Sequence, residues 1–252
     1  MLPIERQNQI LKILENKNLS KLDELHDQIP SASISTLRRD IKTLEEEGKI
    51  EYLFGGAVRL RDATGEIGFT KKKHDHQAEK KVIATIAANE IGENNTIYVD
   101  SGTTCTLLLD KIKNKRITIY TTNTQVCHIA GNFKAEIILI GGKYNGVTSS
   151  LTGALTNDLL SKLRFDKSFF GINGVSVESG YTTPQFDEAI KKQLIAKRTV
   201  QSFILADDSK FGISSNVQAL NLKDAVLISN ESDSEIAKQT QIICSESKKS
   251  NS

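Results

Sequence analysis

The chain has 252 residues, of which 38% are hydrophobic and 25% are charged, with a net charge of +2. This composition is typical of a soluble globular protein of about two domains. No apolar run approaches the ~18 residues that span a membrane, and the first ten residues lack the apolar core of a signal peptide. The cysteines are too scattered for a disulfide framework, so we expect free thiols and a cytoplasmic location for Cys105, Cys127 and Cys244.

Apolar residues at helical spacing open the chain and predict three short helices, over residues 4–16, 20–29 and 33–47. Ser20 is the expected N-cap of the second helix, and Gly48 is expected to follow the third. Two alternating runs then flank Gly55 and Gly56, a pattern that predicts a β-hairpin. Together these elements predict a winged helix-turn-helix over residues 1–61.

The segment 62–76 is polar and mostly aperiodic, so we expect a linker there, followed by a helix over residues 77–91. From residue 96 onward strand patterns alternate with helical ones, which predicts an α/β domain with a largely parallel sheet over residues 77–245. The expected strands are 96–100, 117–121, 136–140, 167–171, 201–206 and 225–229, and the clearest helices between them are 104–111 and 186–198.

Charge alone does not point to nucleic acid, because residues 1–60 carry nine basic and ten acidic residues. The third helix is more informative. At about 100° per residue, its apolar seam of Ile34, Leu37, Ile41 and Leu44 lies opposite Arg39. Such a face is typical of a recognition helix in the major groove, where Arg reads guanine and Ser or Thr contacts bases or phosphates. The expected DNA-binding residues are Ser33, Ser35, Thr36, Arg38, Arg39 and Lys42, with Arg59 on the hairpin; the alternative is an ordinary solvated helix.

Small polar loops follow several of the expected strands. In the first of them, "DSGTT", glycine and hydroxyl side chains precede a helix, an arrangement that attracts phosphate. In open α/β sheets ligands bind beyond the carboxyl ends of the strands, where further loops of this kind would meet. The candidate anion-binding residues are Asp100, Ser101, Gly102, Thr103, Thr104, Thr122, Asn123, Gly141, Gly142 and Lys210; the alternatives are an ordinary capped turn and a surface lysine.

Other sites receive little support. His74 and His76 have no cysteine or carboxylate cluster beside them, so we expect no metal site. The phosphate-binding pattern G-x-x-x-x-G-K-[ST] and the dinucleotide pattern G-x-G-x-x-G do not occur. We therefore expect no cofactor.

The motifs "STLRRDIKTLEEEGKI" and "FGGAV" resemble the DNA-binding module of the DeoR-type bacterial repressors. "YVDSGTT", "TTNT", "ILIGG", "LTGALT", "FFGINGV" and "LADDSKFG" resemble the effector domain of that family, in the same order. The resemblance implies a transcriptional regulator, usually a repressor of sugar-metabolism genes. It also implies an effector domain similar to ribose-5-phosphate isomerase that senses a phosphorylated sugar.

This resemblance implies operator DNA, a phosphorylated sugar and a second copy of the chain as partners, in a dimer or tetramer without catalytic activity. It also carries the effector role onto the anion-binding residues named above. Two alternatives remain from the residues themselves. One is a sugar-phosphate isomerase with an appended DNA-binding domain, using Asp100, Glu188 or Asp207 as base. The other is a winged helix that binds a protein partner.

Overall fold

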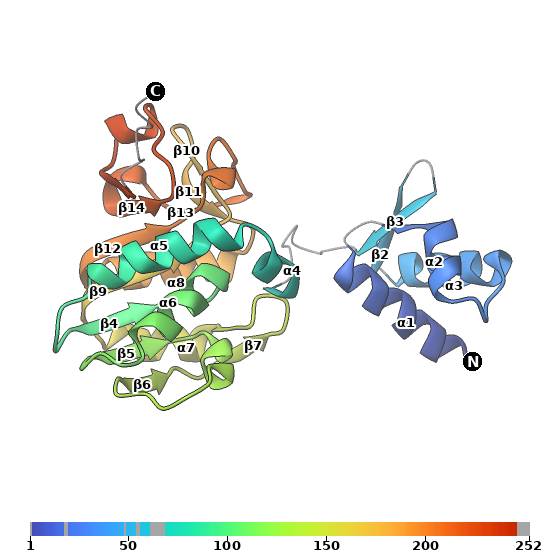
Figure 1. Ribbon diagram of the computed structural model, residues 1–252, viewed down its shortest axis with the longest axis horizontal. Coiled ribbons are helices and arrows are strands. Elements are labelled where there is room, and N and C mark those ends of the chain that lie inside the picture. The colour runs from blue at the N-terminus through green and yellow to red at the C-terminus, as the bar shows by residue number, and fades with distance from the viewer. Residues whose placement is uncertain (1, 18–19, 48, 54–55, 61–68, 246–252) are drawn as a thin grey trace, which may run out of the picture. The chain divides into compact units, whose positions relative to one another are not determined.

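The computed structural model describes residues 2–17, 20–47, 49–53, 56–60 and 69–245. The chain divides into two compact units, of which the first ends at His74 and the second begins at Asp75. The described elements of the first unit are the helices α1 (Pro3–Asn16), α2 (Leu22–Gln28), α3 (Ile34–Glu46) and α4 (Phe69–His74) and the strands β1 (Ser20–Lys21), β2 (Ile50–Leu53) and β3 (Ala57–Leu60). Figure 1 shows the three larger helices beside the hairpin. Helix 33–47 and the hairpin are confirmed, whereas Gly48, Phe54, Gly55 and Arg61 lie outside the described residues.

The described core of this unit is an apolar cluster contributed by α1, α2, α3 and the hairpin. The seam of α3 is confirmed for Leu37, Ile41 and Leu44, which are at most 2% exposed, whereas Ile34 at the helix start is 36% exposed. These side chains pack against Ile10 and Leu14 of α1, Leu22, Leu25 and Ile29 of α2 and its end, and Ile50 and Val58 of the hairpin. Burial of one face leaves the opposite face of α3 to solvent.

Ser20 is not an N-cap, and the predicted helix 20–29 was two residues too long at its start. Ser20 and Lys21 form β1, which pairs antiparallel with Val58 and Ala57 of β3. The backbone N–H of Leu22 then donates to the carbonyl of Gly56, at 3.2 Å, so the extended backbone before α2 is held by the hairpin. A tertiary pairing thus replaces the local cap. The segment expected as linker also contains α4, which the sequence patterns did not predict.

The second unit contains a parallel sheet of seven strands in the order β15-β14-β12-β9-β4-β5-β6. Its strands are β4 (Thr96–Val99), β5 (Thr118–Thr121), β6 (Glu136–Leu139), β9 (Phe165–Gly171), β12 (Thr199–Leu205), β14 (Val226–Ser229) and β15 (Ile242–Cys244). Six of the seven were predicted. The helices around it are α5 (Gln77–Asn89), α6 (Thr103–Ile112), α7 (Ala154–Ser161) and α8 (Phe186–Ala196).

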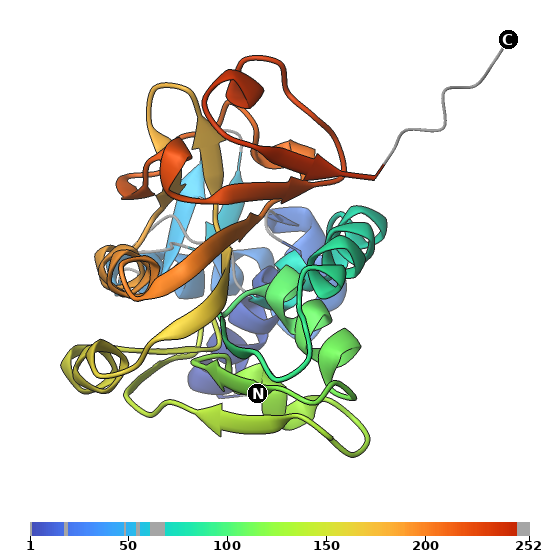
Figure 2. The ribbon, with the colours of Figure 1, turned by 90° about the vertical axis from the view of Figure 1, so that its left-hand side faces the viewer.

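Helices cover both faces of this sheet. Successive side chains of a strand point to opposite faces, so apolar residues on both faces need a covering layer. Ile97 and Val99 of β4 belong to the apolar cluster with α5 and α6, whereas Tyr98 between them belongs to the cluster with α7 and α8. Figure 2 shows the same division, with the teal and green helices on one side of the sheet and the yellow and orange ones on the other. The predicted α/β domain with a largely parallel sheet is therefore confirmed.

Two small antiparallel additions complete the second unit. One is the sheet β10-β11-β13, formed by Gly174–Ser176, Gly180–Thr183 and Val217–Leu220; the other is the hairpin of β7 (Lys143–Asn145) and β8 (Ser150–Thr152). Short 3-10 helices follow several strands, at Thr124–His128, Asp208–Lys210, Leu222–Asp224 and Ile236–Lys238. These short pieces carry too little pattern to be predicted from sequence.

Candidate nucleic-acid interface and effector site

The start of α3 is fixed by Ser33. Its Oγ accepts a hydrogen bond from the backbone N–H of Thr36 at 3.2 Å, so Ser33 is the N-cap. The hydroxyls of Ser35 and Thr36 lie 2.9 and 2.8 Å from the same oxygen. The three predicted hydroxyl residues therefore form one small group at the N-terminus of the helix, the end that enters a groove in helix-turn-helix proteins.

The outer face of α3 carries exposed cations. Arg38, Arg39 and Lys42 are all exposed, and Lys42 lies 3.9 Å from Glu46 in an ion pair so open to water that it contributes little. Arg59 lies in β3 opposite Glu51, and its side chain is outside the described part of the structure.

Asp40, the acidic residue nearest to these cations on α3, does not reach the surface. It is 4% exposed and forms an ion pair with Arg6 of α1, whose Nε and Nη2 both donate to its carboxylate, the second at 3.1 Å. This pair ties α1 to α3 and neutralises the carboxylate. The first two turns of α3 therefore present positive charge without an exposed carboxylate, as a phosphate backbone requires.

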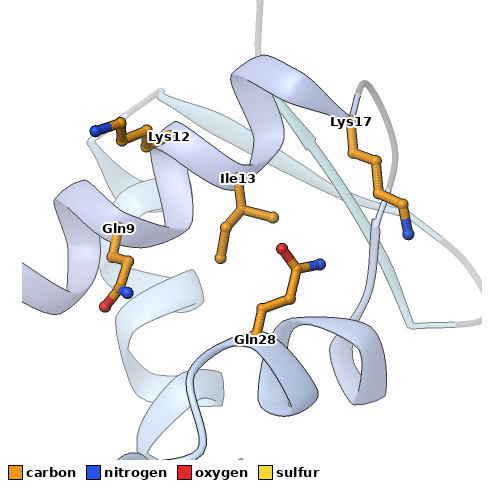
Figure 3. Close-up of a pocket in the computed structure, with 5 residues that line it drawn as sticks. All are labelled: Gln9, Lys12, Ile13, Lys17 and Gln28. Carbon is orange, nitrogen blue, oxygen red and sulfur yellow. The ribbon is translucent and has the colours of Figure 1, made fainter.

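A polar pocket of about 480 Å³ lies between α1 and α2 in the same unit. Figure 3 shows Ile13 and Gln28 pointing toward one another across it. Its other lining residues are Gln9, Lys12 and Lys17, and the ammonium of Lys17 pairs with Glu24 at 3.0 Å. None of the residues predicted to bind DNA or effector lines this pocket.

In the second unit the loop between β4 and α6 places glycine and hydroxyl side chains at the start of a helix. Gly102 is the N-cap of α6 with φ of 109°, a backbone conformation that favours glycine. Ser101, Thr103 and Thr104 are each only 8% exposed. Their hydroxyls make no hydrogen bond within the described part of the chain, but they are not among its fully buried atoms without a partner, so they keep some access to solvent. The N–H of Thr106 donates to the carbonyl of Gly102 at 2.9 Å, and the amides before it are those that every helix start leaves without a helical partner. Free hydroxyls and helix-start amides are groups to which a phosphate can bind.

Thr122 and Asn123, after β5, lie beside this loop and are fully buried. The Asn123 amide Nδ2 donates to Oγ1 of Thr106 at 2.9 Å and to the carbonyl of Asp100 at 3.4 Å. Oγ1 of Thr122 lies 2.7 Å from the hydroxyl of Tyr98. The structure therefore brings these two predicted residues together with the first loop.

Two glycines and a lysine of the predicted set have other neighbours. A Cβ on Gly142 would lie 1.8 Å from Oγ1 of Thr156 and 2.7 Å from the carbonyl of Thr152, so only glycine fits there. Thr156 also donates to the carbonyl of Gly141 at 2.8 Å, which places this loop against the first turn of α7. Lys210 ends the 3-10 helix after β12, two strands away from β4 in the sheet.

Sequence reasoning missed that Asp100 belongs to a buried group of four charged side chains. We call Asp100, Glu188, Lys191 and Lys192 the charged cluster; each is at most 3% exposed. Nζ of Lys192 lies 2.6 Å from Asp100 Oδ2 and 3.2 Å from Glu188 Oε2. Nζ of Lys191 lies 3.0 Å from Glu188 Oε2, 3.4 Å from Asp100 Oδ1 and 3.1 Å from Oγ1 of Thr122.

Neighbouring hydroxyls complete this network. Ser150 of β8 donates to Oε1 of Glu188 at 2.5 Å, and the Tyr98 hydroxyl donates to Asp100 at 3.1 Å. Burial opposes ionisation of Glu188, but the two lysines and Ser150 outweigh it and hold the pKa of Glu188 well below its usual range. Burial likewise disfavours a charged Lys192, but the two carboxylates outweigh it and raise its pKa. Both shifts favour the ionised forms of Glu188 and Lys192, and the formal charges of the four side chains in the cluster sum to zero.

A signal for this cluster was present in the sequence of α8. At about 100° per residue, Glu188, Lys191, Lys192 and Ile195 lie within about 100° of one another. Ile195 is buried, so charged residues on its face must be buried as well. This shared face indicates that the two lysines point toward the protein interior. That they contact Asp100 is seen only in the fold.

The sequence also predicted free cysteine thiols and no metal site at the histidines. Cys105 is buried, and burial raises the pKa of its thiol, so it is not a reactive thiolate. No group of three or more metal-ligating side chains occurs within the described ranges. In those ranges, too, no helix is long and apolar enough to cross a membrane.

A winged helix-turn-helix with a cationic outer helix shares this chain with a parallel α/β unit that has a buried polar site at its carboxyl edge. These features define a DNA-binding protein with a ligand-sensing unit. Residues 6–62 match the family model described as the DeoR-like helix-turn-helix domain, and residues 75–231 match the DeoR C terminal sensor domain. The chain belongs to the DeoR family of helix-turn-helix transcriptional regulators, as its motifs predicted, and is a regulator rather than an enzyme.

Named relatives agree with this assignment. The chain is 36% identical over 92% of its length to the uncharacterized HTH-type transcriptional regulator FruR of Bacillus subtilis, 93% of which is covered. It is 32% identical to GlpR of Haloferax volcanii (89% of this chain, 88% of that one) and 32% identical to the lactose phosphotransferase system repressor of Staphylococcus aureus (82% and 84%).

Among solved structures, ribose 5-phosphate isomerase A of Methanocaldococcus jannaschii aligns with 54% of this chain and 55% of that one. The TM-score is 0.40 and the sequence identity 13%, so this likeness carries no argument about activity.

Proposed function

We propose that this protein represses a sugar-metabolism operon from the cytoplasm, as a homo-oligomer, and that a phosphorylated sugar bound in its second unit changes its affinity for operator DNA. In this proposal residues 1–61 bind the operator, residues 62–76 connect the units, and residues 77–245 bind the effector. Relatives whose names include a lactose phosphotransferase system repressor support a role in sugar metabolism.

The exposed Arg39, centred on the outer face of α3, is the observation that supports DNA recognition best. We assign the groove contacts to it, to Ser35 and to Lys42, and the phosphate contacts to Arg38, Thr36, Ser33 and Arg59. Helix-turn-helix proteins usually bind paired half-sites as dimers, which supports a homo-oligomer.

The unpaired hydroxyls of Ser101, Thr103 and Thr104, which keep some access to solvent although their residues are largely buried, support a phosphate at the start of α6. The helix dipole and the first-turn amides favour an anion at the same position. Asp100, Gly102, Thr122 and Asn123 form its surroundings, and we include Gly141, Gly142 and Lys210 because they follow other strands at the same edge of the sheet.

One experiment tests both parts. The full-length protein selects binding sites from a random pool of duplex DNA, and the enriched duplex is then titrated with and without a panel of hexose and pentose monophosphates, the matching free sugars and inorganic phosphate. We expect an enriched palindromic site whose affinity changes with at least one phosphorylated sugar and with no free sugar. Failure to enrich any sequence would refute DNA recognition, and an affinity indifferent to the whole panel would refute the effector.

A matched pair of variants locates the effector. Thr104→Val removes one hydroxyl of the loop at nearly constant volume and should weaken the response to the phosphorylated sugar. Thr85→Val is the control, because that exposed threonine donates only to Lys81 within α5. Equal responses from the two variants would exclude a phosphate at the start of α6.

A further inference from the structure

The charged cluster directly adjoins the loop to which we assign the phosphate. Asp100 precedes Ser101 in the chain, and its carboxylate lies 2.6 Å from Lys192 and 3.4 Å from Lys191. Thr122, from the next strand, bonds to Lys191 at 3.1 Å. The lysines of α8 therefore lie at the carboxyl edge of the sheet, beside the loop that carries the free hydroxyls.

Stability alone is a weak reason for such a cluster. Removing two ammonium and two carboxylate groups from water is costly, and apolar residues of similar volume often stabilise a core equally well or better. The face of α8 that carries Glu188, Lys191 and Lys192 also carries Ile195, which packs in an ordinary apolar core. The change from apolar to charged residues occurs where α8 meets the edge at which α/β proteins bind ligands.

The charge balance decides which part of a ligand the cluster suits. Two carboxylates and two ammonium groups sum to zero, so a phosphate dianion would find no net positive charge there. A hydroxyl group both donates and accepts hydrogen bonds, so it can donate to a carboxylate and accept from an ammonium at once. The cluster is therefore matched to neutral hydroxyls, and the start of α6 to the anion.

Resting on the proposed effector site, we propose that Lys191, Lys192 and Asp100 form a second subsite that binds the hydroxyl groups of the sugar while the Ser101–Thr104 loop binds its phosphate. Glu188 is a positioning residue, because its Oε2 bonds to both lysines and its Oε1 is held by Ser150. This subsite makes the protein select a polyhydroxylated phosphate over phosphate itself.

The test compares two ligands on a charge-balanced variant. Glu188→Gln together with Lys191→Met removes one charge of each sign, so the cluster stays neutral. Binding of inorganic phosphate and of the sugar phosphate to which the wild type responds best is measured by titration calorimetry on the full chain. We expect affinity for the sugar phosphate to fall about tenfold or more, the loss for a hydrogen bond to a charged group, with phosphate affinity kept within about twofold.

A second pair of variants tests the same subsite in case the Glu188→Gln/Lys191→Met variant does not fold. Ser150→Ala removes the hydrogen bond to Glu188 without changing charge, and should weaken sugar phosphate binding while leaving phosphate binding unchanged. Ser202→Ala is its control, because Ser202 is also a buried serine, 7% exposed, but bonds to Ser168 inside the sheet. If Ser150→Ala weakens both ligands equally, the cluster is only structural and the subsite is excluded.

The remaining outcomes separate this inference from the proposed function. Unchanged sugar phosphate affinity in a cooperatively folded double variant would overturn the subsite alone. A wild type that binds no phosphorylated sugar and no free sugar would overturn the effector, and with it the subsite. A free sugar that the wild type binds and the double variant loses would uphold the subsite and overturn the phosphate part of the proposed function.

Discussion

The two units of this protein place their positive charges in opposite ways. On α3 the arginines and Lys42 point into solvent, and the one acidic side chain among them is buried against Arg6. On α8 the lysines are buried and paired with two carboxylates in a neutral network. An exposed, unneutralised face is suited to a large anionic partner, whereas a closed neutral network is suited to a small ligand that exchanges hydrogen bonds.

Removing one buried lysine is the strongest way to test this contrast. Lys192→Met leaves Asp100 and Glu188 with a single positive partner, so a net negative charge is buried. Breaking a buried pair in this way costs about 3–5 kcal/mol of unfolding free energy. Urea unfolding of the second unit should show the loss. The control, Lys197→Met at the exposed end of α8, should stay within about 0.5 kcal/mol of the wild type, and equal losses would contradict a tight cluster.

Removing an exposed arginine should have the opposite effect, with stability kept and DNA binding weakened. Arg39→Ala should leave the melting temperature unchanged but weaken binding to the selected DNA site by about 1–3 kcal/mol and relax its sequence preference. Fluorescence anisotropy with labelled duplex measures both. Arg116→Ala, an exposed arginine of the second unit, is the control. An Arg39→Ala protein with wild-type affinity would remove Arg39 from the groove.

What the sequence could predict follows from how far apart the determining residues lie. The apolar seam of α3 and the position of Arg39 depend on residues within two or three turns, so helical geometry predicted them. The parallel sheet was predicted because each of its main strands is an apolar run of its own. Ser20 was misassigned because it pairs with Val58, 38 residues further along the chain, and no local pattern contains that partner.

The charged cluster could not be predicted from the sequence for the same reason. Its partners Asp100 and Lys192 are 92 residues apart in the chain, and Ser150 reaches Glu188 from a β-hairpin that carries almost no sequence signal. Asp100 and the loop after it were predicted because the strand, the turn and the helix that form them are contiguous. Residues contributed by a distant helix require the fold.

Acid should weaken the cluster through protonation of Glu188. The folded-state pKa of Glu188 is lowered, so its contribution to stability is present above the unfolded value of about 4.3 and is lost as pH falls through the folded value. The pKa of Lys192 is raised, so its contribution is complete below about 10.4, the unfolded value, and is lost only at higher pH.

The stability difference between the wild type and the Glu188→Gln/Lys191→Met variant measures this dependence. It should be level from about pH 6 to 9 and shrink below about pH 4.3, by at most about 1.4 kcal/mol per pH unit for one group. Urea unfolding at each pH provides the values. A difference that stays constant down to about pH 3 would show that Glu188 has an ordinary pKa.

Substitutions of Ser33, at the exposed start of α3, are expected to have the smallest effect of these changes. They distinguish a structural role of this serine from a contact with DNA. Its hydroxyl caps α3, so Ser33→Ala should cost about 1 kcal/mol of stability. Ser33→Asp keeps a cap and gains from the helix dipole, so it should retain stability. The new carboxylate would, however, sit at the end of α3 nearest the DNA backbone and repel its phosphates. Loss of DNA affinity in the stable Asp variant would place Ser33 at the interface, whereas unchanged affinity would reduce its role to capping.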